Sequence, residues 1–148
     1  MIALLWTLLR QSPAGPPAVK RAVVVCPAGL VDNWAAEVKK WLSPERLATT
    51  TVRGGGAKAK AAATTWAVPA QRASQVLVTS FESLRGIAAE VAAAQPGILV
   101  CDEGHRLKGG GAKTLAALRA LSAPRRIILT GTPSAFSRRR RILAALRV

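Results

Sequence analysis

Two adjacent carboxylates, Asp102 and Glu103, follow directly after a short apolar run at residues 98–101. Four apolar residues that include β-branched Ile and Val are typical of a buried parallel strand. In open α/β sheets, ligands bind beyond the carboxyl ends of the strands, which is where this pair stands. Mg²⁺ prefers carboxylate and phosphate oxygens, so Asp102 is a candidate metal ligand and Glu103 could orient or polarise a water molecule. A turn that uses Asp-Glu-Gly only to leave the strand and cap a helix explains the pair equally well.

Strands and helices that could position this pair alternate along the chain. Apolar runs predict strands at residues 22–26, 49–52, 76–79, 98–101 and 127–129. Apolar spacing and terminal Ser, Pro or Gly predict helices at residues 1–11, 33–42, 80–94 and 113–121. This alternation predicts an α/β fold, a doubly wound parallel sheet flanked by helices.

Some regions carry more specific expectations. We expect the first helix to be largely buried, with Trp6 inside it, and Trp41 to pack in the core. Ser43 and Pro44 should end the second helix, because proline cannot continue it. Residues 54–73 are rich in Gly, Ala and Lys, and we assign no chemistry to them.

Three blocks of sequence narrow the function. Residues 26–34 read Cys-Pro-Ala-Gly-Leu-Val-Asp-Asn-Trp, residues 101–108 read Cys-Asp-Glu-Gly-His-Arg-Leu-Lys, and residues 127–133 read Ile-Ile-Leu-Thr-Gly-Thr-Pro. In this order they resemble motifs Ia, II (the DEAH-type box) and III of superfamily-two helicases and DNA translocases. With Thr-Ser-Phe-Glu at residues 79–82, the chain most resembles the Swi/Snf branch, and within it the Rad-fifty-four recombination translocases.

The resemblance implies a fold and a set of roles. Residues 1–133 would form part of the first RecA-like lobe of a P-loop NTPase, and residues 134–148 an Arg-rich tail of uncertain origin. Asp102 would hold Mg²⁺, Glu103 would activate water for ATP hydrolysis, and His105 would help to link the nucleotide and DNA sites. The resemblance places nucleic-acid contacts at Pro27, Asn33, Trp34, Thr79, Ser80 and Lys108, of which Thr79 and Ser80 belong to motif Ib. It places coupling at Thr130, Gly131 and Thr132, at the end of a strand that would lie beside the acidic pair. Core packing for Trp34, helix capping for Ser80 and a helix-entry loop for His105 are compatible alternatives.

The phosphate-binding pattern of such motors is missing from these residues. No Gly-x-x-x-x-Gly-Lys-Ser/Thr occurs, and the two nearest matches, at residues 54–59 and 109–114, place an alanine between glycine and lysine. We expect both segments to be flexible surface loops. The resemblance places the phosphate-loop strand in the sheet interior, beside the strand that ends at Thr130. We therefore expect an incomplete lobe, inactive alone, with ATP and Mg²⁺ used only by the complete motor.

The charge balance points to an anionic partner. The chain has 22 Lys and Arg against 7 Asp and Glu, a formal net charge of +15. Such a balance favours nucleic acid, although a solvated basic surface is also compatible. The resemblance implies a nuclear double-stranded DNA translocase of recombinational repair or chromatin remodelling, with recombinase or chromatin proteins as possible partners. The alternatives are a non-catalytic basic nucleic-acid-binding fragment and a product without a function of its own.

The remaining chemistry of the sequence is sparse. Cys26 and Cys101 lie in predicted buried strands, match no metal-binding spacing and are expected to be core thiols in a reducing compartment. One histidine gives no basis for a usual zinc site. The apolar start is too short to span a bilayer and lacks the features of a signal peptide, so we expect an intracellular protein with no membrane partner.

Overall fold

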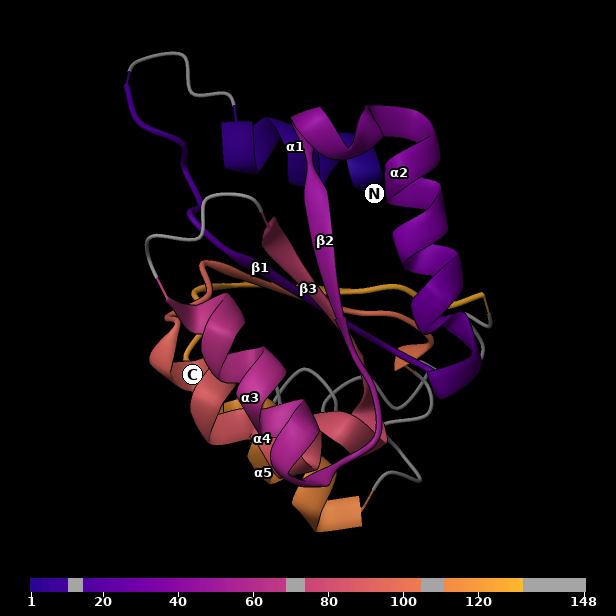
Figure 1. Cartoon of the computed structure of the whole chain (residues 1–148), viewed down its shortest axis with the longest axis vertical. Helices are drawn as coiled ribbons and strands as arrows, with labels where there is room; N and C mark the ends of the chain where they lie inside the picture. Colours follow the sequence, from indigo (N-terminus) through magenta and orange to yellow (C-terminus); the bar gives the residue numbers. More distant parts are fainter. Residues whose placement is uncertain (11–14, 69–73, 105–110, 132–148) are drawn as a thin grey trace.

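The computed structural model describes residues 1–10, 15–68, 74–104 and 111–131, and it is built on a parallel β-sheet (Figure 1). Within these residues the sheet has five strands in the order β2-β3-β1-β4-β5. The strands are β1 (Ala22–Cys26), β2 (Ala48–Val52), β3 (Ser74–Ser80), β4 (Ile98–Cys101) and β5 (Arg125–Ile128). All four pairings are parallel, so the carboxyl ends of the strands meet at one edge of the sheet. The predicted α/β fold with a parallel sheet is confirmed.

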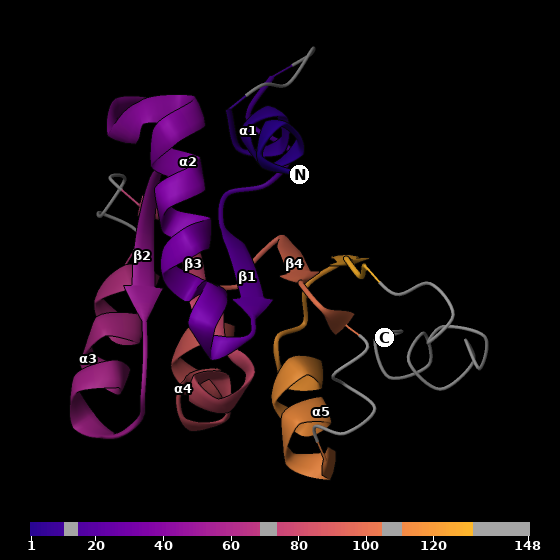
Figure 2. The same ribbon diagram turned by 90° about the vertical axis from the view of Figure 1, so that its right-hand side faces the viewer.

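Helices cover both faces of this sheet, as Figure 2 shows. On one face lie α1 (Ile2–Arg10) and α2 (Val31–Arg46). On the other lie α3 (Gly56–Ala67), α4 (Phe81–Ala93) and α5 (Gly111–Ala120). Every residue of β1 and β4 is buried, which is typical of parallel strands covered on both sides and explains their continuous apolar sequence.

Side chains on the two faces of the strands pack into two separate hydrophobic cores. Val24 and Val100 point toward the cluster that includes Leu5 and Leu9 of α1. Their neighbours along the strands instead join the cluster formed with α3, α4 and α5. Alternation along a strand sends successive side chains to opposite faces, so a four-residue apolar strand serves both cores.

Strand β5 lies at an edge of the described sheet, where β4 is its paired neighbour. Its last three residues are only partly buried and its first is exposed. The prediction that a phosphate-loop strand belongs beside this strand stays a prediction.

Of the two expectations about the first helices, the burial of α1 is wrong and the break of α2 at Ser43 is confirmed. In α1 only Leu5 and Leu9 are buried, Trp6 is partly buried and Leu4 is 42% exposed, so this helix lies on the surface with one face inward. Helix α2 continues to Arg46, although Ser43 has a non-helical backbone, with φ 53° and ψ 155°. The helix therefore breaks at the predicted place, and one further turn follows the break.

The segment without a predicted element contains helix α3. Ala59, Ala63 and Trp66 are its buried residues, and their spacing of four and three residues forms one helix face. The Arg21 guanidinium lies 5.1 Å from the centre of the Trp66 ring. It also donates hydrogen bonds to the carbonyl oxygens of Trp66 and Val68, the latter at 2.8 Å. This clamp fastens the end of α3 to the start of β1.

The surface loops expected at residues 54–59 and 109–114 are found only in part among the described residues: Gly54 and Gly55 are exposed and lie outside any helix, but helices begin at Gly56 and Gly111. Residues from Gly56 onward form the first turns of α3, and residues from Gly111 onward form those of α5. Both glycines have positive φ, of 78° and 69°, so they act as helix starts rather than as parts of a mobile loop. Among the helices in the described ranges, none has the length and apolar composition that a bilayer span requires.

Candidate functional site

The acidic pair lies at the carboxyl edge of the sheet, between β1 and β5. Backbone hydrogen bonds fix it there: the Asp102 N–H donates to the Val25 carbonyl at 2.8 Å, and the Gly104 N–H to the Leu129 carbonyl at 2.9 Å. The Leu129 N–H in turn donates to the Cys101 carbonyl at 2.8 Å. The residues after β4 and those after β5 therefore run side by side, as the sequence predicted.

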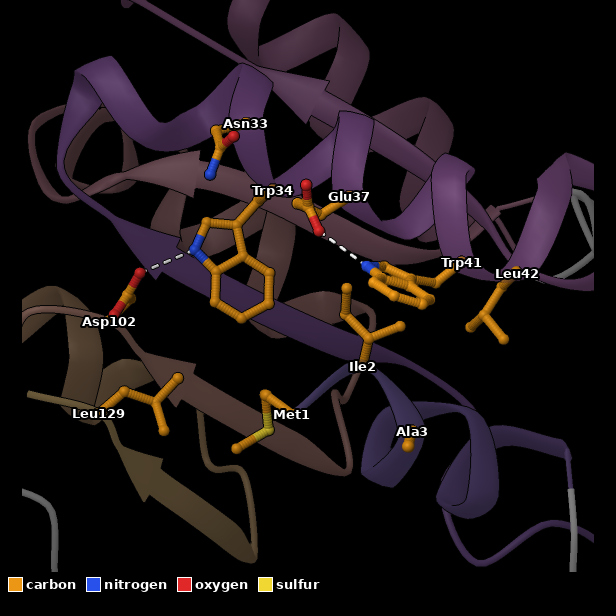
Figure 3. Close-up of a pocket in the computed structure, with 10 residues that line it drawn as sticks. All are labelled: Met1, Ile2, Ala3, Asn33, Trp34, Glu37, Trp41, Leu42, Asp102 and Leu129. Carbon is orange, nitrogen blue, oxygen red and sulfur yellow. Dashed lines mark hydrogen bonds between the residues drawn. The ribbon is translucent and has the colours of Figure 1, made fainter.

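Both carboxylate oxygens of Asp102 accept hydrogen bonds, and Figure 3 shows the one from Trp34. Oδ2 accepts from the indole Nε1 of Trp34 at 2.8 Å, and Oδ1 accepts from the backbone N–H of Glu103 at 2.9 Å. The first bond comes from helix α2 and the second from the turn itself. Two donors from different elements restrict the rotation of this carboxylate, whose side chain is partly buried.

The backbone of the acidic pair is strained. Glu103 has φ 52°, in the left-handed region that a residue with a Cβ seldom adopts. Such a conformation costs on the order of 1–3 kcal/mol and is concentrated at functional sites. The next residue, Gly104, is buried, and a Cβ there would collide with the side chain of Ile128. Glycine is favoured at this position because the Ile128 side chain of β5 lies so close that a Cβ would force one of the two segments to move.

A cleft of about 620 Å³ opens beside Asp102. Its walls, drawn in Figure 3, come from the start of α1, one side of α2 and the residues that follow β4 and β5. They consist of Met1, Ile2, Ala3, Asn33, Trp34, Glu37, Trp41, Leu42, Asp102 and Leu129.

One end of this cleft, at Asp102, is suited to a divalent cation. The amino end of a helix attracts anions through its free N–H groups and its dipole, and the first turn of α1 is one wall. Asp102, in the same cleft, offers oxygen atoms that each keep lone pairs beyond the hydrogen bond already accepted. Asp102 therefore fits a divalent cation that takes its other ligands from phosphate or water, while the rest of the wall is mostly apolar and adds the carboxylate of Glu37 rather than a cationic side chain.

Trp41 is not in the core, so that prediction is wrong. It is 65% exposed, and its indole Nε1 donates to the Glu37 carboxylate at 2.8 Å. Val31 and Val38, seven residues apart, form the buried line of α2. Trp34 and Trp41, also seven residues apart, lie beside that line and open onto the cleft. Helical spacing alone does not separate the buried line from the side next to it.

Comparison with known proteins gives the family. The sequence model of the SNF2-related domain matches residues 1–138. The chain belongs to this family. The predicted resemblance to the Swi/Snf branch is therefore confirmed.

The relatives are DNA repair proteins. Over 141 residues the chain is 42% identical to the Saccharomyces cerevisiae protein named DNA repair and recombination protein RAD54. It is 44% identical over 137 residues to the Schizosaccharomyces pombe DNA repair protein rhp54, and 40% identical over 136 residues to the Gallus gallus RAD54-like protein. Each match covers 89% of this chain but only 16%, 16% and 18% of the relative. The chain thus spans less than a fifth of the length of these relatives.

Within the SNF2-related domain, the residues of motif Ib are buried. The Thr79 hydroxyl donates to the Val52 carbonyl at 2.9 Å, and the Ser80 hydroxyl accepts from the Ser83 N–H at 3.0 Å. The capping role considered for Ser80 is confirmed. Pro27 of motif Ia is also buried, whereas Asn33 is exposed on the cleft wall. Nucleic-acid contacts at these residues stay predictions.

The remaining predicted site residues divide into two groups. Thr130 is partly buried and Gly131 is exposed, immediately after the segment that pairs with the acidic box. Three others, His105, Lys108 and Thr132, lie outside the described residues.

Two contacts at this edge of the domain escaped the sequence analysis. The indole of Trp34 bonds Asp102, 68 positions away, and Arg53 after β2 forms an ion pair with Asp32 in the first turn of α2. Both contacts join segments that only the sheet order brings together, so no local spacing indicates them. The one available signal was Asp32, an acidic residue in the first turn of a helix, and this signal does not indicate which residue it pairs with.

The two cysteines are buried free thiols in β1 and β4, as predicted. Burial, with smaller contributions from the charges of Asp102 and Glu82, raises the pKa of Cys26 to about 12. Burial also raises the pKa of Cys101 to about 12, against a weaker opposing effect of Arg126.

Among the described residues, no group of three or more His, Cys, Asp or Glu side chains could hold a metal ion by itself. A metal at Asp102 would thus draw further ligands from phosphate or water.

Proposed function

We propose that this chain is part of an ATP-dependent double-stranded DNA translocase of recombinational repair. The observation that carries the proposal is the shared cleft of Asp102 and the first turn of α1, in a domain of the SNF2-related family. The names of the RAD54 relatives supply the repair and recombination context. This function implies a nuclear location and, as protein partners, a recombinase or chromatin proteins.

The acidic pair would carry the hydrolytic chemistry. Asp102 would hold Mg²⁺ and Glu103 would orient the attacking water; Mg²⁺, when bound, offsets the negative charge of the ATP phosphates. Fixing the carboxylate in advance matters because a ligand that is already oriented loses less entropy on binding. The hydrogen bonds from Trp34 and from the Glu103 N–H supply that orientation.

The other predicted roles complete the proposal. Residues 1–133 would be the first RecA-like lobe and residues 134–148 a basic tail. His105, Thr130, Gly131 and Thr132 would couple the nucleotide site to the DNA site. The predicted contacts to DNA would come from Pro27, Asn33, Trp34, Thr79, Ser80 and Lys108. Because Thr79 and Ser80 are buried in the present structure, contact through their side chains would require that edge to open.

A translocation assay tests this proposal. The segment of Saccharomyces cerevisiae RAD54 that matches this chain is replaced by the chain itself, and the chimera is assayed for displacing a third strand from a DNA triplex. We expect ATP-dependent displacement, with unmodified RAD54 as the positive control. A soluble chimera that binds duplex DNA but leaves the triplex intact in the presence of ATP would contradict the proposal.

The charge distribution favours a second candidate, a basic fragment that binds nucleic acid without catalysis. All seven acidic residues lie at or before Glu103, whereas 11 of the 22 Lys and Arg follow it. Deleting residues 134–148 separates the two candidates. A fragment that binds through its tail should lose most of its DNA affinity, whereas a motor lobe should keep the part contributed by motifs Ia and Ib.

A further inference from the structure

Helix α2 carries two tryptophans whose indole N–H groups bond carboxylates. Trp34 donates to Asp102 at 2.8 Å, and Trp41 donates to Glu37 within its own helix at 2.8 Å. Only the first bond leaves the helix and reaches the edge of the sheet. It spans 68 positions of sequence and joins motif Ia to the acidic box.

The bond to Asp102 is placed where it controls orientation. The Glu103 N–H already holds Oδ1 at 2.9 Å, but one bond leaves the carboxylate free to turn about it. A second donor on Oδ2 removes that freedom. Bonds from N–H groups to an ionised carboxylate are about twice as strong as bonds between neutral groups, and the partly buried surroundings strengthen them further.

We propose that Trp34 is a positioning residue for Asp102, holding its carboxylate in the orientation that receives the divalent cation. The inference rests on the proposed function, because it takes Asp102 as the metal ligand. Trp34 thereby has a role different from the nucleic-acid contact that the family resemblance implies. Outer-sphere partners of this kind orient metal ligands, and their loss typically weakens metal binding by 10- to 100-fold.

Core packing is the competing explanation for Trp34, since its ring is partly buried against the core beneath α1 and α2. Trp34→Phe separates the two explanations, because phenylalanine keeps an aromatic ring but has no N–H. Trp6→Phe is the matched control. Trp6 is also partly buried against the same core, yet it is not part of the cleft wall.

The test uses the RAD54 chimera that carries this chain, with ADP and with Mn²⁺, which replaces Mg²⁺ and is detected by electron paramagnetic resonance. We expect Trp34→Phe to raise the Mn²⁺ dissociation constant about tenfold or more. Trp6→Phe should leave it within about twofold, and Asp102→Ala should abolish the site. An unchanged constant in Trp34→Phe, or an equal loss in Trp6→Phe, would overturn the inference while leaving the proposed function standing.

Nuclear magnetic resonance of the unmodified chain gives a second measurement, which does not depend on the folding of any variant at position 34. Mn²⁺ at Asp102 should broaden the indole N–H signal of Trp34 well before that of Trp66, which lies in α3 on the opposite face of the sheet. If Mn²⁺ binds and the Trp34 signal stays sharp, the inference is wrong. If Mn²⁺ binds neither to the chimera nor to the unmodified chain, both the inference and the assignment of Asp102 as a metal ligand fail.

Discussion

Gly104 lies against Ile128 so closely that any Cβ at residue 104 would collide with the isoleucine side chain. The contact joins the acidic box to β5, and the Gly104 N–H bond to the Leu129 carbonyl runs beside it. The glycine thus lets the two segments of the site approach each other. A larger residue must push β5 or the acidic pair away.

Gly104→Ala should destabilise the chain. Overpacking in a close-packed site typically costs about 1–3 kcal/mol, and Ile128 has backbone neighbours that limit its retreat. Urea unfolding followed by tryptophan fluorescence measures the change. Gly86→Ala in α4 is the control: a Cβ there meets nothing within 4 Å, so alanine should be neutral or stabilise by up to about 1 kcal/mol. Equal stability of the two variants would contradict the close approach.

Trp66→Ala should be among the most damaging substitutions in the chain. The side chain is 2% exposed and is packed with Ala59 and Ala63, so its removal leaves a large cavity. Replacing a buried tryptophan by alanine typically costs about 3–5 kcal/mol. Trp41→Ala, on a residue that is 65% exposed, should cost much less in the same urea experiment. A larger loss of stability in Trp41→Ala than in Trp66→Ala would mean that the core includes the Trp41 side of α2, which contradicts the structure.

Continuous apolar runs in the sequence predicted strands well, whereas helical spacing of single residues predicted burial poorly. Strands β1 and β4 were predicted with their observed bounds, because continuous apolar runs of this length have few other structures in a doubly wound fold. Helix α3 was missed because alanine, lysine and threonine give weak contrast between its faces, although Ala59, Ala63 and Trp66 were correctly spaced. The exposure of Trp41 was missed for the opposite reason, since a large aromatic residue at helical spacing resembles a core position.

The candidate site was predictable in part. The acidic pair, its place at a strand end and the neighbouring segment after β5 follow from the sequence and the family motifs. The bond between Trp34 and Asp102 does not, because it depends on how α2 lies across the sheet rather than on either motif. The same is true of Gly104, whose role appears only when Ile128 is placed beside it.

The cysteine thiols should be inert in the folded chain. Because burial raises the pKa of both Cys26 and Cys101 to about 12, they stay protonated at pH 8, and the thiolate is the reactive form. Reaction with a thiol reagent such as dithionitrobenzoate should be slow in buffer and complete in denaturant. Rapid modification of either cysteine without denaturant would contradict their burial.

The same thiols make stability fall as the pH rises above about 8.5. In the unfolded chain they ionise near their ordinary pKa of about 8.5, whereas in the folded chain they keep their protons until about pH 12. The unfolded state therefore binds fewer protons between these values, and rising pH favours it by up to about 1.4 kcal/mol per pH unit for each thiol. Urea midpoints at pH 7, 8.5 and 10 measure this slope. The double variant Cys26→Ala and Cys101→Ala should have a clearly smaller one.

Binding to double-stranded DNA should depend strongly on salt. Each phosphate contacted by Lys or Arg lowers the logarithm of the association constant by about 0.9 per tenfold rise in salt. Fluorescence anisotropy with a labelled duplex, at several NaCl concentrations, gives the slope for the full chain. Six contacts would give a slope near −5. A slope close to zero would mean that the net charge of +15 is a solvated surface rather than a DNA-binding one.

If Asp102 and Glu103 form the hydrolytic site of a DNA motor, phosphate release must depend on Glu103. The measurement uses the RAD54 chimera that carries this chain, with and without duplex DNA, beside its Glu103→Gln variant. We predict DNA-stimulated phosphate release that falls by at least about 100-fold in Glu103→Gln while ATP binding is retained. Equal release by the chimera and the variant would show that the acidic pair is not the hydrolytic site.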